Sequence, residues 1–461
     1  MEKKRKKIFI RIGVLILILV ALSMGVNLFV THKAEKIIHE KLVNSVSQLS
    51  DGRYSLDYES LNVNILAGFF AVNNICLATN DSLSSLKIKK ISFEGLGFLF
   101  REFIKNKDLP FSEIKIQISI DTTTIHLPDN LYTLGIGKTT LNLKDSLLQM
   151  NDITYVSTIP KWEFASKYSN WLDLKLGIIE LKGFHIQQFI EEKTILLDSV
   201  FIADVDFSNF KNHKIPTPHN IQPLIYEYVQ KFPTPFFVQY LKASDLNIIY
   251  EELAKNGTDP GFIKFTHMEG IFDEGLTNIV SSHTQTNRLV ASGKLMNEGL
   301  INAELYFPVD STYDQVIIKG ALGTMNMISL NTIIEPLLPA RIKSGFIQHL
   351  DYHIQGGREK AEIDMCLQYN DLAVQVLLPV GDKRLNIGLL SLIATGLIKK
   401  NNPEKGKEIR CVSAEQTRDP YRSSFNYLWK IYFAGVEETL GYTKKRREKV
   451  EWILHQFHKS E

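Results

Sequence analysis

The sequence predicts a mainly β protein that is attached to a membrane by one N-terminal helix. Three observations lead to this prediction: an uncharged apolar run near the N-terminus, many segments in which apolar and polar residues alternate, and helical spacing of apolar residues near the C-terminus. Alternation with a period of two indicates strands with one buried and one polar face, as in antiparallel sheets. We therefore expect an elongated antiparallel β ectodomain, either groove-like or sandwich-like, followed by C-terminal amphipathic helices.

Residues 1–30 are predicted to form a basic cytoplasmic tail and a transmembrane anchor. Ile8–Val30 is interrupted by only Arg11, Ser23 and Asn27 as strongly polar residues, and reaches the ~20 residues that a helix needs to cross a bilayer. The basic run directly before it places the N-terminus in the cytoplasm and the rest of the chain across the membrane. A cleaved signal peptide is the competing interpretation, but its apolar run is ~7–15 residues long and ends in a small-residue cleavage site. No such site follows Asn27, which favours a retained anchor.

Residues 31–50 carry apolar side chains at helical spacing and are predicted to form an amphipathic helix that ends at Asp51-Gly52. From there the period changes to two, and a first β region is expected over residues 51–215. Its strands are predicted at Tyr54–Tyr58, Leu61–Ile65, Val72–Ala78, Leu86–Phe93, Ile114–Ile120 and Thr123–Leu127.

A loose internal repeat lies within this first β region. Leu86–Gly95 and Leu174–Gly183 are both apolar-rich strand patterns that end in glycine. Each is followed by a short apolar linker and then by another strand pattern. Repeated units that stack to bury a shared face are typical of elongated β assemblies.

The proline-rich segment Lys211–Pro235 is the clearest interruption of the pattern, and we place a domain boundary there, with a short helix at Leu224–Phe232. A second β region follows at residues 236–380. Its strands are predicted at Val238–Glu251, Phe262–Phe272, Gln285–Lys294, Leu300–Phe307, Gln315–Gly320, Gly345–Ile354, Ala361–Tyr369 and Leu372–Leu378.

Residues 385–461 are predicted to be a helical C-terminal region. A short apolar helix is expected from Leu389 onward, ending before Pro403. An aromatic amphipathic helix is expected at Asp419–Gly441, and a further helical piece around Val450–Phe457. The apolar, aromatic face beside lysine and arginine suits a membrane interface, and it equally suits a helix that caps the open end of the β domain. Helical periodicity does not distinguish a protein surface from a lipid surface, so both interpretations stay open.

The composition excludes few classes of protein. Lys+Arg 53 against Asp+Glu 51 is nearly balanced, which gives no reason to expect a nucleic-acid partner. The three cysteines Cys76, Cys366 and Cys411 are widely spaced and fit neither a disulfide framework nor a zinc site. For Cys366, inside an alternating strand pattern, we expect a buried or half-buried thiol.

The chemical motifs in the sequence are weak, and no catalytic, cofactor-binding or metal-binding residue is predicted. Gly135–Thr140 resembles part of a phosphate-binding loop but lacks its first glycine, and a turn at Gly135–Gly137 is the favoured role. His349, Asp351 and His353 share one strand face at a spacing that a metal ion could use. We interpret that face as the solvated side of a half-buried strand, because metal sites gather ligands from several elements. We therefore do not expect an enzyme.

Several stretches together resemble the AsmA-like family of bacterial envelope proteins. The resemblance lies in a pattern of apolar positions and glycines that is spread over most of the chain; it includes Tyr54–Val63, Val72–Leu77, Leu86–Gly95, Gly345–Tyr352, Tyr369–Val376 and Leu392–Pro403. It implies an inner-membrane anchor, a periplasmic β groove, and a role in outer-membrane biogenesis and phospholipid movement. The family contributes no catalytic residues.

The leading hypothesis is therefore a single-pass protein of the bacterial inner membrane whose periplasmic β groove holds or transfers lipid. Ile363, Met365 and Leu367 would line the groove, and membrane lipid and other envelope proteins would be its partners. The alternative is an anchored scaffold or interaction protein with a closed β core and no cargo.

Overall fold

The computed structural model describes residues 54–64, 68–79, 85–95, 115–127, 129–216, 219–281, 286–338, 340–377 and 398–441. These residues form 19 strands with mixed pairing and a few helices, so the protein is mainly β, as expected. Within these ranges, no helix is both long enough and apolar enough to cross a membrane. The predicted anchor, the helix at 31–50, most of Leu389–Pro403 and Val450–Phe457 lie outside the described residues. The chain divides into two compact units, Met1–Thr158 and Ile159–Glu461.

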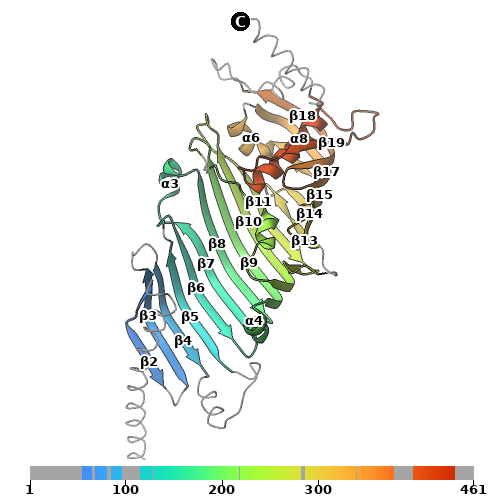
Figure 1. Cartoon of the computed structure of the whole chain (residues 1–461). Helices are drawn as coiled ribbons and strands as arrows, with labels where there is room; N and C mark the ends of the chain where they lie inside the picture. Colours follow the sequence, from blue (N-terminus) through green and yellow to red (C-terminus); the bar gives the residue numbers. More distant parts are fainter. Residues whose placement is uncertain are drawn as a thin grey trace, which may run out of the picture. The chain divides into compact units, whose positions relative to one another are not determined.

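The described part of the first unit is an antiparallel sheet (Figure 1). β3 pairs with both β1 and β2, and from β3 to β7 each strand pairs with the next. The strands are β1 (Tyr54–Asp57), β2 (Ser60–Asn64), β3 (Phe69–Thr79), β4 (Ser85–Glu94), β5 (Gln117–His126), β6 (Tyr132–Asn142) and β7 (Leu147–Ser157).

Two expectations for this unit were wrong. The two strands expected between Ile114 and Leu127 form one strand, β5, and Gly135 and Gly137 lie inside β6 rather than in a turn. Both errors have the same cause, because β3 to β7 each carry one out-of-register residue, which the strand pairing skips and which interrupts the alternation. In β6 this residue is Gly137, where a Cβ atom would lie 2.8 Å from the Cβ of Asp152, itself at φ 53°.

The second unit contains the longest strands. They are β8 (Asn170–Lys182), β9 (Ile195–Asn212), β10 (Phe236–Leu253), β11 (Gly261–Phe272), β12 (Leu276–Thr277), β13 (Thr286–Leu295), β14 (Gly299–Pro308), β15 (Val316–Leu322), β16 (Met325–Asn326), β17 (Ala340–Gly356), β18 (Lys360–Val376) and β19 (Val412–Thr417). The helices are α3 (Lys161–Lys167), α4 (Ile186–Glu192), α5 (Ile225–Gln230), the 3-10 helix η2 (Met327–Leu330), α6 (Asn331–Leu337) and α8 (Ser424–Leu440).

The sequence repeat has a structural counterpart. β4 is followed by Gly95 (φ 87°) and β8 is followed by Gly183 (φ 67°), and both glycines occupy the left-handed region that favours this residue. Each strand pairs in antiparallel fashion with the next strand in the chain. The fourth residue of each repeat, Lys89 or Gly177, is the one that falls out of register.

The prediction of an entirely antiparallel β structure was wrong, because one pair of neighbouring strands is parallel. β9 and β10 run parallel along their full length, from Ile195 opposite Phe236 to Asn212 opposite Leu253. Parallel neighbours need a crossover of a dozen or more residues. The proline-rich segment at which we placed a boundary supplies that crossover, inside the second unit, and its helix is α5. The two strands expected between Ala361 and Leu378 also form one strand, β18.

The main core lies between the sheet and α8 (Figure 1, red). α8 packs on β18 and β19. Its inward residues recur at helical spacing, and they include Tyr427, Ile431, Ala434 and Gly435. The helix begins after Ser423, whose side chain accepts a hydrogen bond from the Asn426 N–H at 3.4 Å, and ends at Gly441 with φ 96°.

Candidate functional site

The first candidate site is one face of the sheet in the first unit. Strand register aligns its apolar side chains into four rows that each cross β3 to β7. Each out-of-register residue shifts the alternation of side-chain direction along its strand by one position. The two rows before it and the two rows after it therefore lie on the same face of the sheet. In strand order the rows are Phe70, Phe93, Ile118, Leu141, Leu148; Val72, Ile91, Ile120, Thr139, Met150; Ile75, Ile88, Thr123, Ile136, Ile153; and Leu77, Leu86, Ile125, Leu134, Tyr155.

The opposite face of the same strands is polar. One of its rows consists of Ser92, Ser119, Thr140 and Gln149 on four successive strands. The described elements of this unit are all strands, so none of them forms a second layer over the apolar face. Burial of apolar area stabilises by about 25 cal/mol per Å², so a face of this composition is stabilised when other apolar groups cover it. Its members Val72, Ile75 and Ile153 are 6%, 8% and 8% exposed.

The residues predicted to line a groove lie in the second unit and are not open to a ligand. Ile363, Met365 and Leu367 are 0%, 1% and 3% exposed, and they belong to the main core. α8 covers this part of β18, where Gly435 lies against Met365 and Ile363. The expectation that these residues line a groove was therefore wrong, because a helix more than 50 positions later in the chain fills the space.

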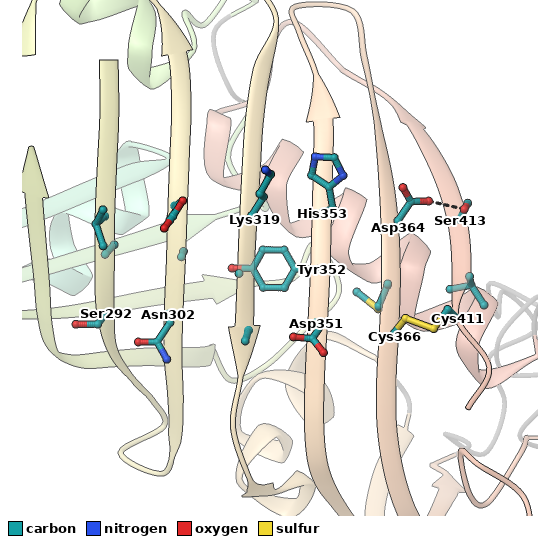
Figure 2. Close-up of a pocket in the computed structure, with 18 residues that line it drawn as sticks. Ser292, Asn302, Lys319, Asp351, Tyr352, His353, Asp364, Cys366, Cys411 and Ser413 are labelled. Atoms are coloured by element: carbon teal, nitrogen blue, oxygen red, sulfur yellow. Dashed lines mark hydrogen bonds between the residues drawn. A yellow bond between two sulfur atoms is a disulfide. The ribbon is translucent and has the colours of Figure 1, made fainter. Parts of the chain in front are cut away.

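The polar face of the second unit holds a broad hollow of about 1080 Å³ (Figure 2). Two rows of side chains cross six strands, from β13 to β19, and line it. One row is Val290, Glu304, Lys319, His353, Asp364 and Ser413; the other is Ser292, Asn302, Ala321, Asp351, Cys366 and Cys411.

This hollow places titratable groups near one another without a recognisable catalytic arrangement. The Ser413 hydroxyl donates a hydrogen bond to the Asp364 carboxylate. His353 is next to Asp364 in the row, and its Nε2 is buried without a hydrogen-bond partner among the described residues. Nucleophilic catalysis requires a nucleophile and a base within hydrogen-bond reach. No serine–histidine hydrogen bond is present in the described part of this hollow.

The three residues of the predicted histidine face, His349, Asp351 and His353, lie in different environments. His349 Nε2 lies 3.0 Å from Asp351 Oδ2, and both side chains are exposed, whereas His353 is half-buried in the hollow. Across the described ranges, no group of three or more His, Cys, Asp or Glu residues is placed to hold a metal ion.

Two of the three cysteines are paired, contrary to what the sequence predicted. Cys366 of β18 forms a disulfide with Cys411, so the expectation of a buried or half-buried thiol was wrong. Cys411 immediately precedes β19, which pairs with β18, and this pairing brings the two sulfur atoms together. The pairing joins segments that are 45 positions apart, and no local pattern signals it. Cys76 of β3 is free.

Sequence comparison adds no relative to this description: neither the family models nor the curated proteins contain a match to the chain.

Proposed function

We propose that this chain is a membrane-anchored, AsmA-like protein of the bacterial envelope that holds or transfers lipid, with hydrocarbon chains lying on the apolar face of its first unit. One observation carries the proposal: four in-register apolar rows cross β3 to β7 on one face, while the other face is polar. A lipid acyl chain laid across such rows would leave water at a gain of about 0.8 kcal/mol per buried methylene. No bond is made or broken.

The composition of the face supports hydrocarbon as the cargo. The side chains in its rows are aliphatic or aromatic apart from Thr139, Thr123 and the hydroxyl of Tyr155. A headgroup would need charged or hydrogen-bonding partners, which these rows do not offer. The face therefore suits acyl chains whose headgroups stay outside it.

Two further observations support the placement in the envelope. The apolar run Ile8–Val30 behind a basic cluster is the pattern of an anchor with a cytoplasmic N-terminus. The Cys366–Cys411 disulfide supports an oxidising compartment such as the periplasm, since cytosolic proteins rarely keep structural disulfides. The resemblance to the AsmA-like family suggests the same location.

The alternative function is an anchored scaffold with no cargo, and the main core of the second unit favours it. There α8 packs on β18 and β19, and Ile363 and Met365 are inaccessible to solvent. If the first unit were closed in the same way, the chain would present only its outer surface to protein partners.

Photocrosslinking at paired positions tests the proposal. Ile120 and Ser119 are neighbours in β5, both half-buried, and lie on the apolar and the polar face respectively. A photoreactive amino acid at Ile120 in the full-length protein in bacterial membranes is expected to crosslink phospholipid, detected by mass spectrometry. The same amino acid at Ser119 serves as the control. Equal labelling at both positions, or none at Ile120, would reject a lipid-binding face.

A second arm measures lipid occupancy. Ile120→Lys is expected to reduce the phospholipid that co-purifies with the protein in mild detergent, whereas Ser119→Lys is expected to leave it unchanged. Circular dichroism and thermal unfolding establish that both variants fold. A folded Ile120→Lys variant with full lipid occupancy would favour the scaffold.

A further inference from the structure

The crossover helix α5 presents two faces of unlike character. Tyr226 and Glu227 point inward and are 6% and 5% exposed, and Tyr226 packs in the main core. Ile225 and Tyr228 point outward and are 66% and 63% exposed. The inner face anchors the helix, because the Tyr226 hydroxyl donates to the Asp314 carbonyl and Arg358 Nε donates to Glu227 Oε1 at 3.0 Å.

The outer face of α5 continues at both ends as an apolar stripe. Ile221 precedes the helix and is 72% exposed, and Phe232 follows it and is 47% exposed. Ile225 and Tyr228 lie in α5 itself, and Ile221 and Phe232, which flank it, line the same hollow as Tyr228. Clustered exposed apolar side chains mark binding surfaces, whereas scattered ones need no explanation.

Beside this stripe is a hollow of about 620 Å³. Ile221, Tyr228 and Phe232 form part of its wall, together with three prolines. Its polar lining consists of Lys231, Arg358, Arg418 and Glu227. Lys231 Nζ and Arg358 Nε both lie 3.0 Å from Glu227 Oε1, so one carboxylate forms ion pairs with two cations.

Arg418 is the third cation, and it has no counter-ion among the residues that the structure describes. It is only 8% exposed, and no carboxylate lies within ion-pair distance of it in the described ranges of the chain. Its two terminal nitrogens donate to the Arg358 and Gln222 carbonyls, while its Nε is buried without an acceptor. A buried charge is costly unless an opposite charge or further hydrogen bonds compensate for it.

From this geometry we propose that the hollow beside α5 binds an anionic amphiphile, with a phosphate or carboxylate group at Arg418 and hydrocarbon against Ile221, Tyr228 and Phe232. The anion would supply the negative charge that the lining lacks. The apolar wall would receive the chain attached to that anion. This site lies within the second unit, and the inference does not rest on the lipid-binding face proposed for the first unit.

The test uses the full chain in mild detergent and measures binding by native mass spectrometry. The probes are a short-chain phosphatidylglycerol, the phosphatidylcholine with the same chains, and inorganic phosphate. We expect the phosphatidylglycerol to bind most tightly. Arg418→Gln is expected to weaken its binding by about tenfold or more, since a hydrogen bond to a charged group contributes about 1.5–3 kcal/mol. Arg422→Gln is the matched control, because Arg422 is exposed and paired with Asp419.

A second variant tests the apolar wall and keeps the proposal falsifiable if Arg418→Gln does not fold. Tyr228→Ser changes an exposed side chain and is expected to leave the fold intact. It should weaken binding of the short-chain phosphatidylglycerol by about three- to tenfold and leave phosphate binding unchanged.

Several results would overturn the inference. Phosphatidylcholine binding as tightly as phosphatidylglycerol would show that the hollow does not select an anion. Phosphate binding as tightly as the lipid would show that the apolar wall contributes nothing. A dimer that Tyr228→Ser dissociates, with lipid binding unchanged, would assign the stripe to contacts between copies of this chain.

Discussion

Gly435 of α8 lies directly against Met365 of β18. A Cβ atom on this glycine would lie 3.0 Å from Met365 Cε and 3.3 Å from Ile363 Cγ2. The missing side chain lets the helix approach the strand closely enough to exclude solvent from both residues. This contact closes the apolar face at the C-terminal end of the second unit.

Replacing Gly435 with leucine is therefore expected to destabilise the protein. Leucine is the better helix former by up to about 1 kcal/mol, but overpacking of a close-packed core typically costs about 1–3 kcal/mol. We expect a net decrease of at least about 1 kcal/mol in the free energy of unfolding, measured by denaturant titration. Lys430→Leu introduces the same side chain on the exposed side of α8 and is expected to have little effect. Equal stability of the two variants would mean that α8 does not pack as described.

The out-of-register residues of β8 and β9 form a second close contact. A Cβ atom on Gly177 would lie 2.8 Å from Asp204 Cβ and 3.0 Å from its Oδ2, and Asp204 has φ 59°. Gly177→Ala is expected to lower the free energy of unfolding by about 1–3 kcal/mol. In an Asp204→Gly background the same change should cost clearly less, because the clashing side chain is gone. An unchanged cost in that double-mutant cycle would contradict the contact.

The disulfide is expected to contribute to stability because it closes a long loop. Cys366 and Cys411 are 45 positions apart, and replacing both with serine should reduce the free energy of unfolding by about 2–4 kcal/mol. A reducing agent should lower the Tm of the wild type and leave that of the double variant unchanged. Cys76→Ser keeps the disulfide and should respond to reduction as the wild type does. A wild-type Tm that is insensitive to complete reduction would count against a stabilising role.

Glu227 should make stability depend on pH in the acid range. Burial alone raises the pKa of this carboxyl, but the Leu224 N–H, Lys231 and Arg358 outweigh it and hold the pKa at about 2, against an ordinary value of 4.5. Because the folded pKa is the lower one, this contribution to stability is complete above pH 4.5 and is lost as the pH falls towards 2. Glu227→Gln should lower the free energy of unfolding at neutral pH by about 1–3 kcal/mol.

Glu227→Gln should also remove the contribution of this carboxyl to the loss of stability in acid. Measuring the free energy of unfolding at several pH values between 7 and 2 tests this expectation. Glu163→Gln is the control, since the Glu163 side chain forms an exposed ion pair with Lys167 on α3. It should change stability by no more than about 0.5 kcal/mol. If the free energy of unfolding of Glu227→Gln fell with pH as steeply as that of the wild type, Glu227 would not be the source of the acid dependence.

Much of the β structure could be predicted because strand alternation is a local property. The run Ala361–Tyr369 alternates without interruption, and its apolar members Ile363, Met365 and Leu367 are all buried, as their period requires. β6 was missed where Gly135, Gly137 and neighbouring threonines weaken the apolar signal and the out-of-register residue breaks the period. A helix at Asp419–Gly441 could be expected for the same local reason, and α8 lies within that range.

The faces of the regularly alternating strands such as Ala361–Tyr369, and the position of α8, could therefore be predicted from residue order, since side-chain direction repeats every two residues in a strand and every 3.6 in a helix. Which faces meet was not readable. Four features join segments far apart in the chain: the packing of α8 over Met365, the parallel pairing of β9 with β10, the Cys366–Cys411 disulfide, and the hydrogen bonds of Arg418 to the Arg358 and Gln222 carbonyls. Only packing in three dimensions decides such contacts, because their free energy depends on distant surfaces fitting together rather than on local periodicity.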